Sequence, residues 1–207
     1  MTRQTQSDNC KAVAQHFLLP EAEISLWPAW LAEPDAETLL TTLAAELSWR
    51  QEQIRIYGKT VNIPRQQVWM GEPHCSYQYS GVRFAPSSWH PAVQQLVAVV
   101  SNTINRPLNC VLLNLYASGQ DHMGWHADNE PELGVAPVIA SLSLGATRRF
   151  DLQHRTQGHQ LQLQLENGSL LVMAGKCQQH WQHRLPKQSR VAAPRLNLTF
   201  RYIAPPI

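Results

Sequence analysis

The chain has 207 residues, of which 43% are hydrophobic and 15% are charged, and its formal net charge is +2. This size and composition fit one compact domain with a substantial core. No apolar run approaches the roughly 20 residues that a membrane span needs, and the polar first ten residues lack the apolar centre of a secretory signal, so we expect a cytoplasmic protein with no membrane partner.

The small net charge hides an uneven distribution. From residue 140 onward the chain has nine Lys and Arg residues against two acids, a net charge of +7. The residues before it have eight against 13, a net charge of −5. A basic part beside an acidic part favours a polyanionic partner, although ordinary solvated charge gives the same asymmetry.

The four cysteines are Cys10, Cys75, Cys110 and Cys177, which lie far apart and form no Cys-x-x-Cys pair. This spacing argues against a zinc ribbon and against a disulfide framework. We therefore expect reduced and unconnected thiols in a reducing compartment.

The N-terminal part of the chain predicts a tail and one helix. Residues 1–16 are polar, and we expect them to be a disordered tail. Residues 35–49 predict a helix with Asp35 as its N-cap. Its apolar stripe consists of Leu39, Leu40, Leu43 and Leu47.

A second helix is predicted to begin near Pro91, because proline is tolerated in a first helical turn. Its apolar residues recur at helical spacing and are Val93, Leu96, Val97 and Val100.

The residues after about 108 predict strands. Val111–Tyr116 is an apolar run, and Val138–Leu144 alternates large apolar with small or polar residues. Gln160–Glu166 alternates glutamine and leucine, which predicts one wet face and one buried face. Asn167-Gly168 follows as a hairpin signal, with Ser169–Met173 as the expected partner strand.

Arg195–Ile203 is a last alternating segment, with Leu196, Leu198 and Phe200 on one face. Two helices followed by many short strands predict a mainly β fold with some α structure. We expect an antiparallel sandwich or jelly roll with helices packed on one side.

A metal-ligand pattern occurs at His126-Ala127-Asp128. Residues two apart in an extended segment project to the same side, so His126 and Asp128 are candidates to bind one metal ion. Two histidines and one carboxylate on one face leave open positions on ferrous iron for a cosubstrate and dioxygen. The third ligand must come from elsewhere; His180 and His183 are downstream candidates, and spacing alone does not choose between them. The alternative is a surface turn with a hydrogen-bonded His and Asp.

The polar face of the last predicted strand has Arg195, Asn197, Thr199 and Arg201. Arginines that face the inside of a sandwich are costly without an anionic partner. A dicarboxylate fits this need, because guanidinium binds carboxylate through two hydrogen bonds. Structural ion pairs within the protein are the alternative.

The chain resembles the AlkB family of Fe(II)- and 2-oxoglutarate-dependent dioxygenases, over about residues 50 to 203, and is most similar to the homologues that repair duplex and single-stranded DNA. The matching segments, in chain order, are Ile56-Tyr57-Gly58-Lys59, Ile63-Pro64-Arg65-Gln66, Tyr77-Gln78-Tyr79-Ser80-Gly81, Asn114-Leu115-Tyr116, His126-Ala127-Asp128, Trp181-Gln182-His183-Arg184-Leu185-Pro186 and Arg195-Leu196-Asn197-Leu198-Thr199-Phe200-Arg201.

This resemblance implies a double-stranded β-helix, or jelly roll, with N-terminal helices and a nucleotide-recognition lid. It places a single domain at 17–207, with the lid at about 50–90 and the catalytic jelly roll at about 108–203. The implied iron ligands are His126, Asp128 and His183. The residues implied to hold 2-oxoglutarate are Asn114, Tyr116, Arg195, Asn197, Thr199 and Arg201, with Arg195 at the distal carboxylate and Arg201 at the end near iron.

The resemblance also implies how a damaged base is bound. Tyr77 and Tyr79 match the segment that contacts a flipped base, and Glu130 matches a position that reads its amino group. Tyr57 matches an aromatic finger that fills the gap in a duplex. Arg65 is expected to contact phosphate, as is Lys59. Ordinary strand tyrosines, a turn tyrosine and a loop acid are the alternatives from the residues alone.

The implied function is oxidative demethylation of 1-methyladenine and 3-methylcytosine in DNA, a direct-reversal repair that consumes O2 and 2-oxoglutarate and releases formaldehyde and succinate. The first alternative is an RNA demethylase of the same chemistry, acting on tRNA for example. The second alternative is a non-catalytic module that binds nucleic acid. The complete set of metal-ligand candidates argues against it, namely His126, Asp128 and His183. We expect a monomer.

Overall fold

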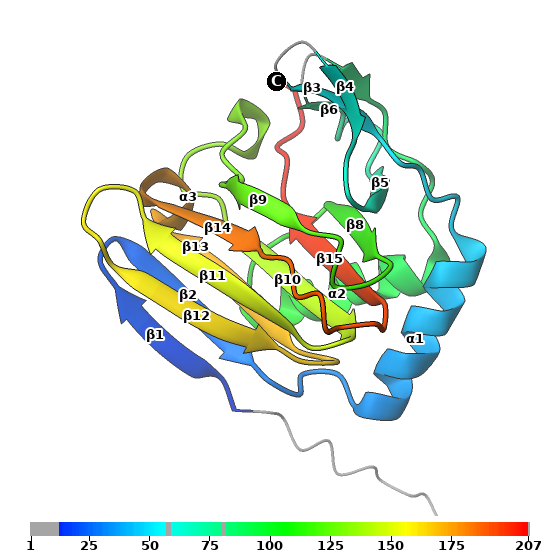
Figure 1. Ribbon diagram of the computed structural model, residues 1–207. Helices are drawn as coiled ribbons and strands as arrows, with labels where there is room; N and C mark the ends of the chain where they lie inside the picture. The colour runs from blue at the N-terminus through cyan, green and yellow to red at the C-terminus, as the bar shows by residue number, and fades with distance from the viewer. Residues whose placement is uncertain (1–12, 57–58, 80–81, 207) are drawn as a thin grey trace, which may run out of the picture.

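The computed structural model describes residues 13–56, 59–79 and 82–206, although not the side chains of residues 54–59 and 77–84. These residues form two packed antiparallel sheets, two long helices and two small hairpins (Figure 1). No helix among them is long and apolar enough to cross a membrane. Two β-sheets packed face to face are the jelly-roll architecture that the sequence predicts.

The larger sheet has seven strands among the described residues, all paired antiparallel. In sheet order they are β1 (Gln15–Leu19), β2 (Ala22–Trp27), β13 (Leu170–Gly175), β10 (Ile139–Gly145), β15 (Arg195–Arg201), β8 (Cys110–Tyr116) and β5 (Gln66–Gly71). Every residue of β15 is buried, because both faces of this strand are covered. The predicted Val111–Tyr116 and Val138–Leu144 strands are confirmed within about one residue.

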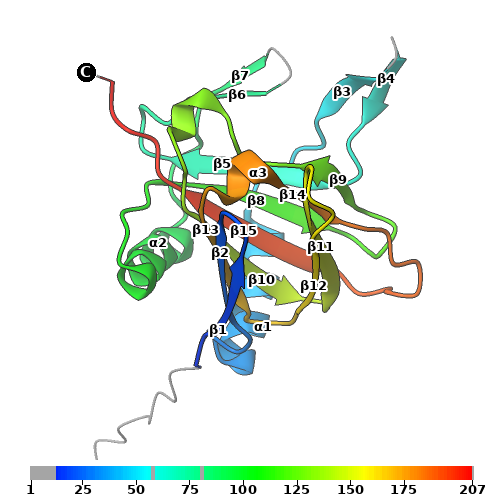
Figure 2. The ribbon, with the colours of Figure 1, turned by 90° about the vertical axis from the view of Figure 1, so that its left-hand side faces the viewer.

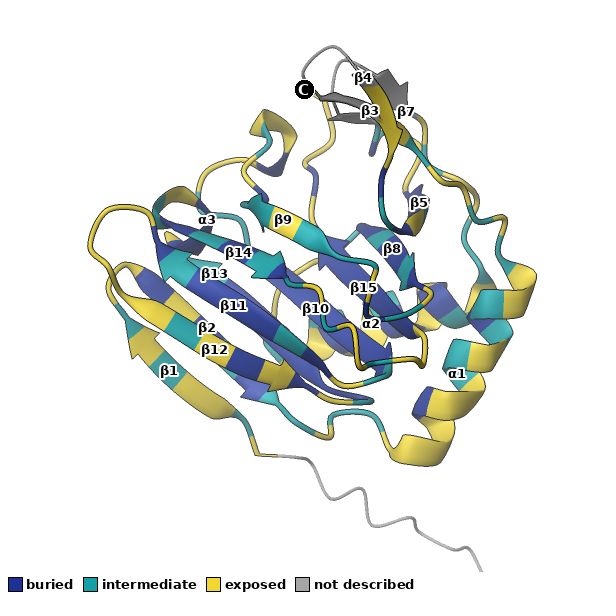
Figure 3. Ribbon diagram, viewed as in Figure 1, coloured by how far each residue is buried: buried dark blue, intermediate teal, exposed yellow. Residues whose placement is uncertain are grey.

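The smaller sheet has four strands, also paired antiparallel. In sheet order they are β12 (Gln160–Leu165), β11 (Arg148–His154), β14 (Trp181–Leu185) and β9 (Met123–His126). Between β13 and β14 the chain forms a short helix, α3 (Cys177–His180), and a 3-10 turn, η1 (Pro131–Leu133), follows β9. The exposed glutamines and buried leucines of β12 confirm its predicted wet and dry faces (Figure 3).

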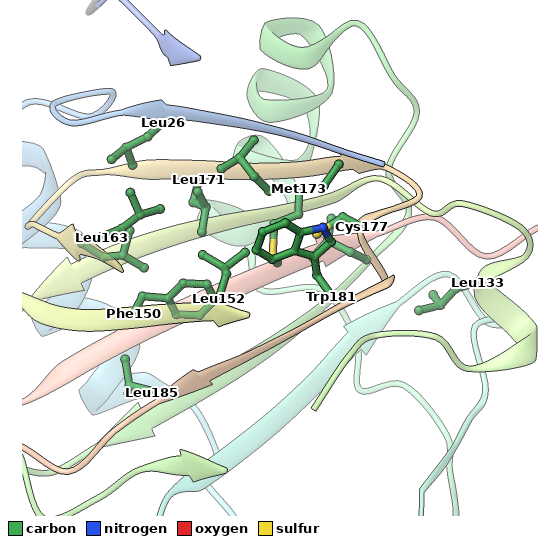
Figure 4. Close-up of a cluster of buried hydrophobic side chains, with 14 of the residues drawn as sticks. Leu26, Leu133, Phe150, Leu152, Leu163, Leu171, Met173, Cys177, Trp181 and Leu185 are labelled. Atoms are coloured by element: carbon green, nitrogen blue, oxygen red, sulfur yellow. The ribbon is translucent and has the colours of Figure 1, made fainter. Parts of the chain in front are cut away.

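Apolar side chains fill the space between the two sheets. Trp181, Leu152 and Phe150 extend from the smaller sheet toward Leu171 and Met173 of β13 (Figure 4). Burial of this set removes a large apolar area from water, which is the main force that holds the sheets together.

A second apolar layer lies on the other face of the larger sheet. Helix α1 (Glu33–Glu46) buries Leu43 there, and α2 (Pro91–Ile104) buries Val93, Leu96 and Val100. They pack against the three alternating apolar residues of β15, which are Leu196, Leu198 and Phe200. The predictions of helices on one side and of a two-faced last strand are therefore confirmed.

Two hairpins extend from the same end of the molecule (Figure 2). One pairs β3 (Gln53–Ile56) with β4 (Lys59–Asn62), and the other pairs β6 (Tyr77–Tyr79) with β7 (Val82–Phe84). Both belong to the segment expected to be a lid.

Three boundary predictions were wrong. Helix α1 begins at Glu33 rather than Asp35; Ala32 is the N-cap, and Pro34 lies in the first turn, where a missing N–H breaks no helical hydrogen bond. Asp35 is instead an acid of the first turn, which the helix dipole favours. Helix α1 also ends at Glu46, three residues early. Residues 15 and 16 of the predicted tail lie in β1.

The predicted hairpin at Asn167-Gly168 was also wrong, because the two flanking strands lie in different sheets. β12 pairs with β11, whereas β13 pairs with β2 and β10. The turn is held by β10 instead: Gly145 N donates to Asn167 Oδ1 at 2.9 Å, and Gly168 N donates to Ser143 O at 2.8 Å. It is therefore a corner between sheets.

We expect Gly168→Ala to lower the free energy of unfolding by more than about 2 kcal/mol. Gly168 has φ +75°, and a Cβ there would collide with the Leu31 carbonyl group. Gly158→Ala is the matched control, because Gly158 has φ +73° but open space around it, so only the roughly 1 kcal/mol backbone cost applies. Urea unfolding measures both, and equal losses would show that the corner tolerates the extra carbon.

Candidate metal centre and cavity

His126, Asp128 and His183 converge at one point between the sheets. Their ligand atoms all lie within 4.8 Å of one another. The antiparallel pairing of β9 and β14 sets His183 opposite His126, and the two ring centroids are 4.2 Å apart. Asp128 follows β9 by two residues and reaches the same point, as the spacing predicts.

The charge states of the three side chains suit a divalent cation. Burial alone would raise the pKa of Asp128, but the nearby Arg201, His183 and His126 outweigh it and hold this pKa at about 2. Arg201 Nη2 donates to Asp128 Oδ1 at 2.9 Å. Burial, and then His126, lower the pKa of His183 to about 3. At neutral pH the carboxylate is ionised and His183 is neutral, which are the forms that bind metal.

Neighbouring groups fix the orientation of both rings. His126 Nδ1 lies 2.9 Å from the carbonyl oxygen of Gly124, which can only accept, so Nδ1 carries the proton and Nε2 is left with a lone pair. Phe150 stacks on His183 with centroids 5.3 Å apart and planes 28° apart. Two oriented imidazoles and one carboxylate are a donor set that fits ferrous iron.

Gln178 is a residue of this centre that the sequence does not reveal. Its Oε1 accepts from the backbone N–H of Asp128 at 3.0 Å, and the side chain is buried. The contact joins α3 to the loop after β9, across 50 residues of chain, and satisfies a buried N–H that no strand pairs. No motif around Gln178 points to this contact.

His180, the alternative that spacing left open, faces away from the centre. Its Nδ1 lies 3.0 Å from Glu21 Oε2, in a second group that also includes His154. His154 Nδ1 accepts from the backbone N–H groups of Thr156 and Gln157, so Nε2 of the neutral ring carries the proton and has no lone pair for a metal. The first group is therefore the better metal site of the two.

A cavity of about 180 Å³ opens beside the metal centre. The polar face of β15 lines it with Arg195, Asn197, Thr199 and Arg201, and β8 adds Asn114 and Tyr116. Thr199 Oγ1 donates to Asn197 Oδ1 at 3.0 Å, and Asn197 Nδ2 donates to Ser141 Oγ at 2.7 Å. These residues form one hydrogen-bonded wall.

Arg195 is a buried, positively charged residue in this wall. Only 2% of it is exposed, and burial lowers its pKa to about 10. Its Nη2 donates to Ser143 Oγ at 2.9 Å, and its guanidinium lies 5.5 Å from the Tyr116 ring centre. Its Nε is buried without a hydrogen-bond partner among the described residues, none of which offers it a carboxylate. A bound carboxylate would supply both the missing charge and the missing acceptor.

Arg65, for which the sequence predicts a phosphate contact, is buried in the cavity wall. Its Nε donates to Asn114 Oδ1 at 3.0 Å. Gln67 Nε2 donates to the same oxygen at 2.7 Å. The pairing of β5 with β8 sets Gln67 opposite Asn114, and both residues line the cavity.

The structure describes the remaining candidate substrate-binding residues to different extents. Glu130 is half-buried and lines the cavity. Tyr77 and Tyr79 lie on β6, but their side chains are outside those described, as is that of Lys59. Tyr57 lies outside the described residues altogether.

Comparison with protein families finds one match that spans most of the chain. Residues 23–201 match the model of the 2OG-Fe(II) oxygenase superfamily. The human protein alpha-ketoglutarate-dependent dioxygenase alkB homolog 3 is 34% identical over 194 residues, which cover 89% of this chain and 67% of the human protein. The Bos taurus DNA oxidative demethylase ALKBH2 is 39% identical over 161 residues, which cover 74% of this chain and 58% of the bovine protein.

Two solved structures share the fold. The structure of OsALKBH1 superimposes with a TM-score of 0.61 at 19% identity, over 90% of this chain and all of that one. A Pseudomonas putida prolyl-4-hydroxylase superimposes with a TM-score of 0.59 at 16% identity, over 88% and 93% of the two chains.

We expect Gln178→Ala to weaken metal binding by about 10- to 100-fold, because the loop that bears Asp128 loses its anchor. Calorimetric titration of the metal-free protein with Mn(II) measures this directly. Gln179→Ala is the matched control, since Gln179 is the exposed neighbour in the same helix. Unchanged affinity in the Gln178 variant would show that the loop holds Asp128 without this bond.

The buried position of His183 predicts acid sensitivity of the metal-free protein. The pKa is about 3 when folded and 6.5 for the free group, so between these values the unfolded chain binds more protons and stability is lost as the pH falls. We expect a slope of up to about 1.4 kcal/mol per pH unit from this group between pH 6 and 4.5. His183→Gln should flatten the slope of unfolding free energy against pH. The same slope in both proteins would contradict a neutral buried His183.

Proposed function

This chain belongs to the AlkB family within the 2OG-Fe(II) oxygenase superfamily, and on that premise we propose that it removes N-linked methyl groups from damaged DNA bases. Its metal is Fe(II), and its cosubstrates are 2-oxoglutarate and O2. The observation that carries the proposal is the convergence of His126, Asp128 and His183 in one cavity beside Arg195, whose Nε has no hydrogen-bond partner in the described part of the chain.

The proposed metal ligands are His126 Nε2, the Asp128 carboxylate and His183. Arg201 keeps Asp128 ionised, and the stacked Phe150 holds the His183 ring in place. When bound, iron would activate O2, with one oxygen atom going to succinate as 2-oxoglutarate is oxidised with loss of carbon dioxide, and the other going to the C–H bond that is hydroxylated.

The polar wall of the cavity is the proposed binding site for 2-oxoglutarate. Arg195 offers its free Nε to the distal carboxylate, while Arg201 lies at the metal end. Asn114, Tyr116, Asn197 and Thr199 complete the wall. Apolar side chains cover the rest of the cavity and exclude water from the reacting carbon; among them are Leu112, Met123 and Leu185.

A methylated base is the proposed occupant of the remaining space. Methylation at N1 of adenine or N3 of cytosine blocks base pairing and leaves a cation, so the base must leave the stack to react. Glu130 lines the cavity and offers an acceptor for the exocyclic amino group and a negative charge for the cation. Tyr77 and Tyr79 are the proposed stacking partners. The hydroxylated methyl group then leaves as formaldehyde, and the normal base remains.

The proposal favours DNA because the relatives at 38–39% identity are named DNA oxidative demethylases. RNA, including tRNA, is the alternative substrate with the same chemistry. We also propose a single domain, which β1 extends to residue 15 from the 17–207 that the sequence predicts. Residues of about 50–90 are its nucleotide-recognition lid and about 108–203 its catalytic part. Action as a cytoplasmic monomer completes the proposal.

The test is anaerobic reconstitution with Fe(II) and 2-oxoglutarate, followed by exposure to air with DNA or RNA oligonucleotides that contain 1-methyladenine or 3-methylcytosine. We expect formaldehyde and restored base from DNA at a higher kcat/KM than from RNA. The reverse order would assign the enzyme to RNA, and formaldehyde from neither would reject demethylation of these bases.

His183→Ala should reduce turnover to background, because the metal loses one of three ligands. His180→Ala is the matched control, since it removes a histidine three residues away that pairs with Glu21, and it should retain most activity. Full turnover by the His183 variant would remove this residue from the metal centre.

A further inference from the structure

The outer face of the smaller sheet has a cluster of charged and aromatic side chains beside the metal centre. Alternation along strands directs His126 and His183 inward, so their neighbours Trp125 and Arg184 face outward. On β11, Asp151 pairs in register with Arg184, and Arg149 lies two residues away on the same face. We call Trp125, Arg149, Asp151 and Arg184 the arginine face.

One carboxylate holds two arginines on this face. Arg184 Nε donates to Asp151 Oδ2 at 2.8 Å, and Arg149 Nη2 donates to the same oxygen at 3.1 Å. Asp151 is only 5% exposed, whereas Arg149 and Arg184 are 37% and 35% exposed. A single Asp neutralises one guanidinium, so the face presents an excess positive charge to solvent.

The guanidinium of Arg184 is fixed on two sides. Asp151 binds its Nε edge, and the ring of Trp125 lies 4.4 Å from its central carbon. Its two Nη groups donate to none of the described residues, although the Asp151 carboxylate lies beside them. A guanidinium that is held in one orientation, with its Nη groups available, can bind a phosphate through two hydrogen bonds. Because the orientation is already fixed, the side chain loses little conformational entropy on binding.

The arginine face extends from β11 across β14 to the edge strand β9, which borders the cavity. Met123 and His126 of β9 line the cavity, as does Ala127 next to it. Two views at right angles place β9 on the side of the smaller sheet toward the β3–β4 hairpin (Figures 1 and 2). A nucleic acid strand that leaves the cavity across β9 therefore meets Trp125 and Arg184 first.

We propose that the arginine face binds a backbone phosphate of the single strand that flanks the base in the cavity. This inference rests on the proposed function, because it assumes a nucleic acid substrate. The neutral side chains Gln153 and Gln182, which pair in register farther along the same strands, add no negative charge that would repel the strand.

The test is binding of a fluorescent 12-nucleotide single strand with a central 1-methyladenine, measured by anisotropy with Mn(II) and 2-oxoglutarate but without Fe(II). We expect Arg184→Gln to weaken binding by about 3- to 10-fold and to reduce the slope of log K against log salt by about 0.7, the value for one phosphate contact on a single strand. Arg184→Lys should bind with intermediate affinity, because it keeps the charge but loses the fork.

Arg106→Gln is the matched control, since it removes one positive charge from the exposed connection after α2. It should bind the strand as the unmodified protein does. An equal loss in the Arg106 and Arg184 variants would reduce the effect to net charge and overturn the proposal, as would an unchanged affinity and salt slope in Arg184→Gln. Thermal unfolding of each variant separates a lost contact from a lost fold.

A second arm separates this proposal from the proposed function. The KM ratio between the 12-nucleotide strand and a methylated trinucleotide should rise for Arg184→Gln, because the shorter substrate does not reach the arginine face. If neither substrate is demethylated by the unmodified enzyme, the proposed function fails, while the anisotropy comparison still judges whether the face binds phosphate.

Discussion

The buried ion pair between Arg201 and Asp128 joins the two sheets at the bottom of the cavity, and the metal centre depends on it. An ionised carboxylate in this position costs several kcal/mol unless a cation lies against it. Arg201, on the interior strand β15, supplies that charge at 2.9 Å. The ion pair thereby holds Asp128 against the larger sheet. The pairing of β9 with β14 holds the two histidines.

The cavity therefore has two arginines that can each bind a carboxylate, and one group of side chains that can bind a metal cation. Arg201 binds the protein's own Asp128 carboxylate. Arg195 lies six residues earlier on the same face of β15, and its Nε, which no described residue pairs, is available for a carboxylate from outside. Because β15 is buried on both faces, neither arginine can turn to solvent. On the proposed function, the strand sets the separation between the metal and the keto acid, whichever methylated base enters.

The sequence predicts features that depend on local periodicity. The alternation of β15 places its arginines inside, and the spacing of His126 and Asp128 gives two of the three converging residues. Features that depend on tertiary pairing were missed. Asn167-Gly168 has a hairpin signal, yet β10 captures the turn as a corner between sheets. Gln178 meets Asp128 only because α3 packs beside the loop that follows β9.

Anomalous diffraction from crystals soaked with Mn(II) and 2-oxoglutarate without oxygen would locate both the ion and the keto acid. We expect one manganese ion bound by His126, Asp128 and His183, with the keto acid chelating it and its far carboxylate on Arg195. An ion at Glu21, His154 and His180 instead, or a keto acid that leaves Arg195 uncovered, would contradict this arrangement.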